Sequence, residues 1–161
     1  MSTYLLLKTL HVISSVFLAG VGFGSAYYLF FANRSNSVAA QAVVARLVAR
    51  ADWAFTTPAG FIQPITGFGL MHMAGWKLNT PWIAWTLVLY VIAGACWLPV
   101  VWLQLQMRKM ADHAVATNTA LPERYWKYAR WWESLGYPAF AAMVIIYFLM
   151  VTKPALPWPG Q

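Results

Sequence analysis

His11 is the residue whose side chain and surroundings most directly suggest binding chemistry. It lies in a long uncharged stretch, and Ser15 and Gly22 follow it at i+4 and i+11, on the same face of a helix. Small residues on that face favour close helix packing, so we expect His11 to point into a helix bundle. A neutral imidazole nitrogen can ligate heme iron or copper there, with Lys8 near a heme propionate. The alternative is a histidine that only hydrogen-bonds to a neighbouring carbonyl or serine.

A second uncharged stretch contains Gln63 and His72. Small and polar residues recur on one of its helical faces, at Thr56, Gly60, Gln63 and Gly67. Pro58 and Pro64 each free a backbone carbonyl, which predicts a kinked pocket wall with Gln63 pointing inward; ordinary packing around two kinks is the alternative. His72 lies about 140° from the Gln63 face. We expect it either to reach the membrane interface or to share a metal or heme with His11.

The other reactive side chains form no recognisable catalytic motif. Four thioethers lie at Met71, Met73, Met107 and Met110. Thioethers are soft copper ligands, but these four are not densely spaced and also suit gap filling. The single cysteine, Cys96, lies in an apolar stretch and is expected to be inert. The sequence contains no serine–histidine–acid arrangement, phosphate-binding loop or zinc motif, which argues against hydrolysis and phosphoryl transfer.

Composition predicts the elements that position these side chains. Of 161 residues, 61% are hydrophobic and 9% charged, whereas a soluble domain averages roughly 45–50% and about 25%. This argues against a disordered chain and a nucleic-acid-binding module, and the single cysteine excludes a disulfide scaffold. Four stretches are long and apolar enough to cross a bilayer as helices, at residues 9–32, 53–75, 81–107 and 134–152. We therefore predict an all-α fold, a single domain over residues 1–161 that forms an integral membrane four-helix bundle.

The positive charges predict the orientation of this bundle. Eight of the 11 Lys and Arg residues lie in the two long connections, at Arg34, Arg46, Arg50, Arg108, Lys109, Arg124, Lys127 and Arg130. Lys8, Lys77 and Lys153 lie on the other side. Because cytoplasmic loops are enriched in Lys and Arg, both termini are expected to face outward from a bacterial cytoplasmic (inner) membrane. The net charge of +7 then faces anionic lipid headgroups and requires no nucleic acid partner.

Short interfacial helices are expected within the two cytoplasmic connections. Residues 37–51 are typical of an amphipathic helix on the membrane surface. Its apolar face is predicted to contain Val43, Val44, Leu47 and Val48. Asp52 is expected to cap the next helix or to pair with Arg46 or Arg50. A second helix is expected at 122–132, where aromatic and basic side chains suit a belt at the lipid headgroups.

Several short motifs resemble a known family. The chain opens with YLLLKTLHV at residues 4–12. Further motifs are Ala51-Asp52-Trp53, Pro58 with Gly60, Thr66-Gly67, Trp82 and Tyr125-Trp126. Together they resemble the bacterial predicted integral membrane proteins of domain of unknown function 2269, over nearly the whole chain. The resemblance implies a four-span inner-membrane protein and no particular reaction.

The segment from Lys8 to His11 is also similar to the opening helix of two other membrane families. These are the copper-resistance D family and the HemJ-type protoporphyrinogen oxidase, whose corresponding histidine is implicated in heme binding. The oxidase has a His-Ala-Lys-like site at the start of its third helix, where this chain has WIAWT at residues 82–86. This likeness therefore implies only that His11 is a candidate ligand of heme b.

Two functions from different classes follow. The first is a membrane protein that binds heme b or a metal near the outer leaflet. Its candidate cofactor-binding residues are His11, Lys8 and Gln63, and its candidate metal ligands are His11 and His72. The second is a non-enzymatic accessory or scaffolding membrane protein without a cofactor, in which Gly20 and Gly24 build helix contacts and the partner is a second copy or a membrane complex. A small carrier is disfavoured, because no predicted span contains a carboxylate.

Overall fold

The chain is entirely helical in the computed structural model, which describes residues 2–157 and has no strand within them. The helices join end to end into four rods. The first rod consists of α1 (Thr3–Val16), the π-helical turn η1 (Phe17–Val21) and α2 (Gly22–Ala32). The second rod consists of α3 (Val38–Ala51), the π-helical turn η2 (Asp52–Thr56) and α4 (Thr57–Met73). The third and fourth rods are the single helices α5 (Pro81–Thr117) and α6 (Glu123–Thr152). The all-α prediction is therefore confirmed.

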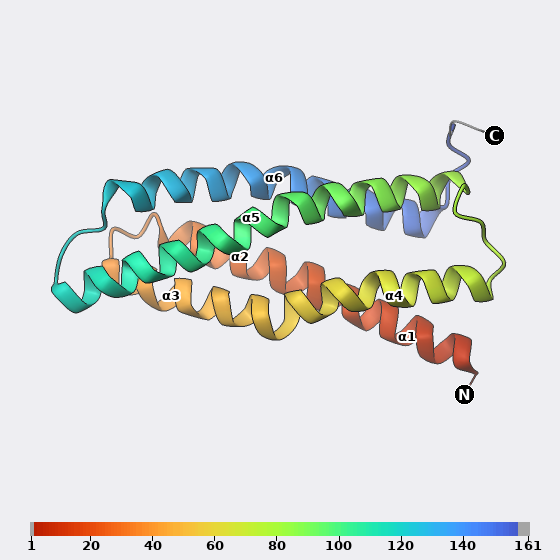
Figure 1. Ribbon diagram of the computed structural model, residues 1–161, viewed down its shortest axis with the longest axis horizontal. Coiled ribbons are helices and arrows are strands. Elements are labelled where there is room, and N and C mark those ends of the chain that lie inside the picture. Colours follow the sequence, from red (N-terminus) through yellow and green to blue (C-terminus); the bar gives the residue numbers. More distant parts are fainter. Residues whose placement is uncertain (1, 158–161) are drawn as a thin grey trace.

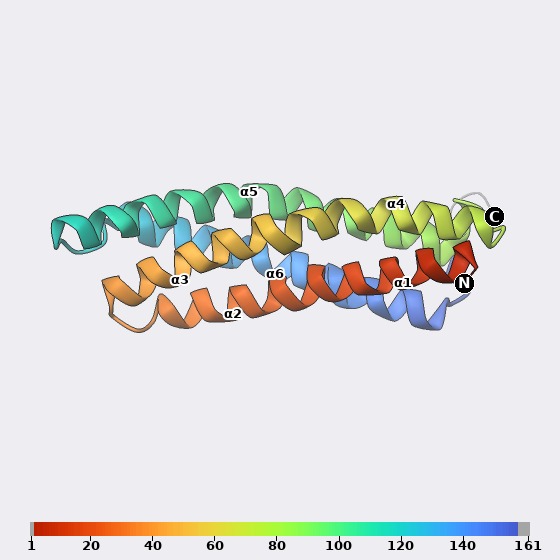
Figure 2. The same cartoon turned by 90° about the horizontal axis from the view of Figure 1, so that it is seen from below.

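The rods lie side by side, and each runs opposite to the one before it in the chain (Figure 1). The start of α1, the α4–α5 connection and the end of α6 lie at one end. The α2–α3 and α5–α6 connections lie at the other end. Seen from below, α3 and α4 form one continuous rod (Figure 2). This order places the two connections rich in arginine and lysine together, as expected from the sequence.

Three of the rods are long and apolar enough to cross a membrane: Thr3–Ala32, Pro81–Thr117 and Glu123–Thr152. They contain the first, third and fourth predicted spans. The second predicted span, at 53–75, falls on η2 and on α4, and α4 alone has 17 residues. Its crossing stays a prediction.

Pro58 explains why the second rod changes its hydrogen-bond pattern at η2. Proline has no N–H, so it cannot donate to the carbonyl of Ala54, four residues earlier. Just before it, the N–H of Thr57 donates to the carbonyl of Asp52, five residues earlier, which is the π-helical pattern. The extra residue rotates α4 about the helix axis relative to α3. A helical face that is predicted with 3.6 residues per turn through this region therefore does not include the rotation.

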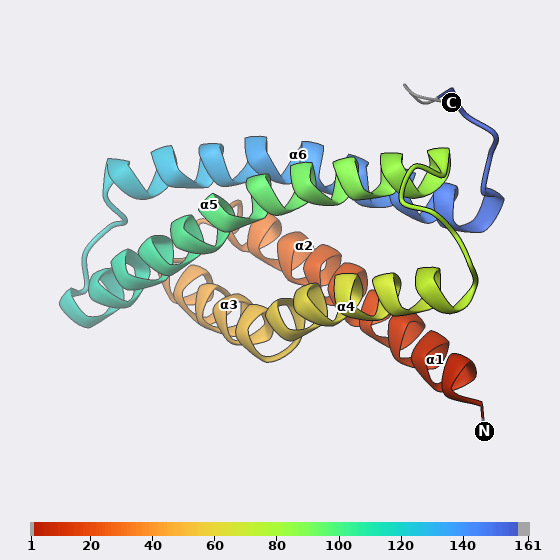
Figure 3. The ribbon, with the colours of Figure 1, turned by 45° about the vertical axis from the view of Figure 1, so that its right-hand side comes forward.

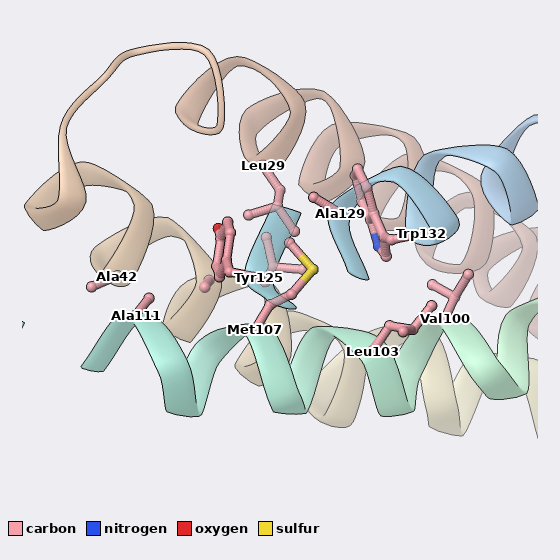
Figure 4. Close-up of a cluster of buried hydrophobic side chains, with 11 residues drawn as sticks. Leu29, Ala42, Val100, Leu103, Met107, Ala111, Tyr125, Ala129 and Trp132 are labelled. Carbon is pink, nitrogen blue, oxygen red and sulfur yellow. The ribbon is translucent and has the colours of Figure 1, made fainter. Parts of the chain in front are cut away.

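The closest packing lies at the end that carries the α2–α3 and α5–α6 connections (Figure 4). With 37 residues, α5 is about 55 Å long, whereas the hydrocarbon core of a bilayer is roughly 30 Å thick. One part of α5 therefore extends beyond a membrane. At the end with the α2–α3 and α5–α6 connections, α5 packs with α2, α3 and α6 around a buried cluster that we call the packed lobe: Leu29, Ala42, Ala45, Val48, Val100, Leu103, Met107, Ala111, Tyr125, Ala129 and Trp132.

Elsewhere, large apolar side chains point away from the protein. Ile65 and Val91 are each 69% exposed, and Val151 is 81% exposed. In water, this arrangement would forgo the free energy of burial, but lipid tails are as apolar as these side chains. The distribution of buried and exposed side chains fits a lipid-facing part joined to a lobe that is packed as in a soluble protein.

The predicted interfacial helices are wrong in their placement. The bounds of α3 match the helix expected at 37–51, but α3 continues into η2 and α4, and it packs along α5. Its buried residues are Gln41, Ala42, Ala45, Val48 and Ala49. Val43 and Leu47, which belong to the predicted apolar face, lie outside this contact and are 45% and 55% exposed. Small alanines allow a closer approach of two helices than the larger side chains do, and this decides which face is buried. The helix expected at 122–132 is likewise the first part of α6.

The ion pairs of the packed lobe differ from those expected for Asp52. Nη1 of Arg46 lies 3.0 Å from Oδ1 of Asp112. Arg34 donates two hydrogen bonds to the Glu133 carboxylate, at 2.9 and 3.1 Å, and these raise the pKa of the Arg34 guanidinium. Asp52 is buried and forms no ion pair within residues 2–157. The expected pairing of Asp52 with an arginine is therefore wrong.

Candidate functional site

Four polar side chains meet between α1 and α4, and we call them the α1–α4 cluster. Nε2 of Gln63 donates to the carbonyl of His11 at 2.7 Å and to Oγ of Ser14 at 2.8 Å. Nδ1 of His11 lies 2.8 Å from Oγ1 of Thr66. Gln63, Ser14 and Thr66 are buried, and His11 is partly buried. The structure thus brings two predicted site residues, His11 and Gln63, to one contact between helices.

The hydrogen bonds of Thr66 assign the proton on His11. The Thr66 hydroxyl donates to the carbonyl of Ile62 at 2.7 Å. Because a hydroxyl has one proton, Oγ1 of Thr66 then accepts its bond from Nδ1–H of His11. Nε2 of His11 is left with a lone pair, and it is the atom through which this imidazole would ligate a metal.

Glycines on α4 allow this close contact. A Cβ added at Gly69 would lie 2.6 Å from Cδ2 of Leu7, and one added at Gly67 would lie 3.3 Å from Cε1 of the cluster's imidazole. A Cβ added at Gly20 or Gly24 meets nothing within 4 Å. The expectation that this second pair builds helix contacts is therefore wrong within the described chain. The glycines that do so lie at i+4 and i+6 from Gln63: Gly67 belongs to the predicted stripe of the second span, whereas Gly69 lies outside that stripe.

Lys8 and His72 do not join the α1–α4 cluster. Both residues are exposed, and no hydrogen bond joins either of them to His11 in the described part of the chain. Across residues 2–157, no group of three or more His, Cys, Asp or Glu residues is placed to hold a metal ion. One imidazole without a second protein donor is a poor match for a metal centre or a bis-histidine heme. Heme or metal binding at His11 therefore finds no support in this geometry.

A cavity of about 300 Å³ lies between two halves of the protein. In one half α1 packs against α4, in the other α5 packs against α6, and α3 joins the halves by packing along α5. The α1–α4 pair and the α5–α6 pair separate toward the end that carries the start of α1 (Figure 3). Side chains from all four rods line the cavity.

Two side-chain contacts bridge the halves beside the cavity. The Tyr90 hydroxyl of α5 donates a hydrogen bond to the carbonyl of Gly60. Pro64 lacks the N–H that would otherwise bond to this carbonyl, so Tyr90 replaces the missing donor. The rings of Phe23 and Phe140 stack with centroids 4.0 Å apart. The two halves are therefore joined by side chains where their backbones are apart.

The predicted polar stripe of the second span is divided between two contacts. Thr56 and Gly60 line the cavity, whereas Gln63 belongs to the α1–α4 cluster and Gly67 contacts the imidazole there. Gln63 does point inward, but toward α1 and not into the cavity. The sequence placed these residues on one helical face and so predicted one site. In the structure they contact two different surroundings, the cavity and α1.

The cavity also contains polar residues that sequence reasoning missed. Asp52, Gln104 and Trp132 line it, and each is at most 6% exposed. Asp52, just before the predicted second span, was expected to cap the next helix or to pair with Arg46 or Arg50, not to line a cavity. A carboxylate adjoining a span and an amide in the third helix are both unusual in lipid, and this is the signal that points to a shared polar site.

The chain was also compared with known proteins. The family model described as Predicted integral membrane protein (DUF2269) matches residues 5–154. No curated protein matches the chain, and no solved structure matches it.

Proposed function

We propose a function for a chain that belongs to the DUF2269 family of predicted integral membrane proteins: it is an accessory or scaffolding protein of the bacterial inner membrane. In this proposal a single four-span domain crosses the membrane with both termini outside. The second span is η2 with α4, Asp52–Met73, which as a helix is about 30 Å long and matches the hydrocarbon core. The start of α1 and the end of α6 lie at the same end of the rods, and this supports an even number of crossings.

The charge distribution supports the orientation. The packed lobe and its connections carry eight of the 11 Lys and Arg residues, as well as Asp112, Glu123 and Glu133. In the proposal this lobe lies in the cytoplasm, where anionic headgroups attract its cations. The opposite end carries Lys8, Lys77 and Lys153.

The scaffolding role rests on one observation, the bridge that Gln63 makes from α4 to the His11 carbonyl and the Ser14 hydroxyl of α1. Hydrogen bonds between helices in lipid average somewhat under 1 kcal/mol each, but several together fix the register of two spans. In this role His11 and Gln63 hold the first two spans together. The assembled spans then bind a partner, which is a second copy of this chain or another membrane protein.

The rival function is a heme or metal site at His11. The lone pair on Nε2 favours it, because donation from Nδ1–H is how a ligating histidine is commonly oriented. Its bis-histidine form would need His72, and its propionate contact would need Lys8; both residues are exposed and neither is hydrogen-bonded to His11 within residues 2–157. A spectrum therefore separates the two functions.

Protein purified in detergent is expected to show no Soret absorbance and only substoichiometric iron or copper. In the same preparation, His11→Ala is expected to lower the free energy of unfolding by about 1 kcal/mol, because it removes the bond to Thr66. His72→Ala is the matched control, since this histidine is exposed at the same end of the rods. A Soret band or stoichiometric metal that disappears in His11→Ala alone would establish the ligand function and end the scaffolding proposal.

A further inference from the structure

The cavity between the two halves is apolar along most of its length and polar at one end. Ala93, Gly94 and Phe140 belong to its apolar wall. Along α5 the lining runs from Tyr90 to Gln104, which corresponds to about 20 Å of helix. The polar end adjoins the packed lobe, and the apolar part extends from there between the lipid-facing helices.

The polar end consists of four buried side chains. Their exposed fractions are 4% for Asp52, 3% for Thr56, 6% for Gln104 and 5% for Trp132. Three polar atoms among them have no hydrogen-bond partner: Oγ1 of Thr56, Oε1 of Gln104 and Nε1 of Trp132. Thr56 and Gln104 lie close enough to Asp52 to interact with its carboxylate, yet Oγ1 of Thr56 makes no bond of normal geometry. Buried polar groups without partners are costly, so this end of the cavity is suited to a polar group of a ligand.

The atoms at the polar end select the kind of group. The Asp52 carboxylate and Oε1 of Gln104 only accept hydrogen bonds, the Thr56 hydroxyl accepts or donates, and the Trp132 indole only donates. Acceptors therefore predominate. No cation pairs with Asp52 within residues 2–157, and a buried carboxylate is stabilised most by a positive charge that also donates hydrogen bonds.

We propose that this cavity binds an amphipathic amine. Its ammonium group lies against Asp52 and Gln104, and its apolar body extends along the wall toward Tyr90. A cavity of about 300 Å³ is at the small end of ligand pockets, which suits a molecule with one or two rings. Phe61 and Leu98 line the cavity and are 67% and 66% exposed, so the ligand enters sideways from the lipid. The inference goes beyond the scaffolding role and does not depend on His11.

Isothermal titration of the full chain in detergent micelles tests this with three probes that share one ring system. These are 1-naphthylmethylamine, 1-naphthalenemethanol and 1-naphthoic acid, at a pH where the amine is protonated and the acid ionised. The amine is expected to bind saturably at one site per chain. The alcohol and the acid are expected to bind roughly tenfold more weakly or not at all, because they lack the positive charge.

Two variants, each with a matched control, locate the site. Asp52→Asn keeps the shape and removes the charge, and it is expected to weaken amine binding roughly tenfold or more, while Glu123→Gln, an exposed carboxylate in α6, leaves it unchanged. Gly94→Leu fills the cavity from a position where an added Cβ meets nothing within 4 Å, and it is expected to abolish binding. Gly20→Leu is its control, equally unobstructed but outside the cavity lining.

Equal binding of all three probes to the wild type and to Asp52→Asn would overturn the proposal, because such binding would show that the probes only partition into the detergent. Unchanged binding in Gly94→Leu would overturn it as well, and this variant stays informative if Asp52→Asn does not fold. Preferential binding of the acid would contradict the assigned charge. Because His11→Ala leaves the cavity intact, it should bind the amine normally, so failure of this inference is separate from failure of the scaffolding role.

Discussion

Replacing Leu103 by alanine is expected to lower the free energy of unfolding by about 2–5 kcal/mol, the range for truncating a buried leucine that leaves a cavity. Leu103 is 4% exposed and lies among the side chains of the packed lobe, where α5 meets α2, α3 and α6. Its truncation removes these contacts and leaves a cavity that the surrounding helices fill only in part. The loss is measured by denaturant titration of the protein in detergent, followed by circular dichroism.

Leu98→Ala is the matched control, one and a half turns earlier on the same helix. Leu98 is 66% exposed and lipid-facing, so its truncation exchanges one apolar contact for another and should change the free energy of unfolding by less than about 0.5 kcal/mol. Equal losses from the two variants would mean that α5 has the same surroundings at both positions. The division into a lipid-facing part and a packed lobe would then be wrong.

Tyr125→Phe is expected to cost about 1–3 kcal/mol, because it leaves a buried acceptor without its donor. The Tyr125 hydroxyl donates to Oδ1 of Asn33 at 2.6 Å, and both residues are buried where the first rod meets α6. Nδ2 of Asn33 already lacks a partner, so after the substitution neither polar atom of the buried side-chain amide has a hydrogen-bond partner. The readout is the same denaturant titration.

Tyr128→Phe is the control for this loss. Its hydroxyl accepts from Nε of Arg124 at 2.8 Å on an exposed surface, where water replaces the lost partner. We expect a change of less than about 0.5 kcal/mol. If Tyr128→Phe destabilises the chain as much as Tyr125→Phe, the Tyr125–Asn33 bond is not what joins α2 to α6.

Much of the fold follows from composition, because length and hydropathy decide which stretches cross lipid. The first, third and fourth predicted spans lie on helices of membrane length, and the family resemblance is confirmed by the match to residues 5–154. The stripe that contains His11 also predicted that this side chain points into the bundle, where its Nδ1 lies 2.8 Å from Oγ1 of Thr66 on α4.

The remaining features depend on local geometry that a regular helical pattern does not include. The missing N–H of Pro58 shifts one hydrogen bond at η2 and rotates the face that carries Asp52 relative to Gln63. Helix continuity was also missed, since charged residues at 122–132 resemble a surface segment although α6 runs through them. The close approach of α3 to α5 depends on alanines such as Ala45, which carry little hydrophobic signal.

The central claim is four crossings with the packed lobe inside the cell. Cysteine accessibility tests it most directly, in a background where the single native cysteine is replaced by Cys96→Ser. Single cysteines are then introduced at three exposed positions in the connections, as Ser35→Cys, Leu78→Cys and Ala120→Cys. A membrane-impermeant maleimide is added to intact cells and, separately, to permeabilised cells.

With four crossings and the lobe inside, Leu78→Cys is labelled in intact cells, whereas Ser35→Cys and Ala120→Cys react only after permeabilisation. If only the three longest apolar helices cross, positions 35 and 120 lie on opposite sides of the membrane. Labelling of either Ser35→Cys or Ala120→Cys in intact cells would therefore contradict the four-span topology with the lobe inside.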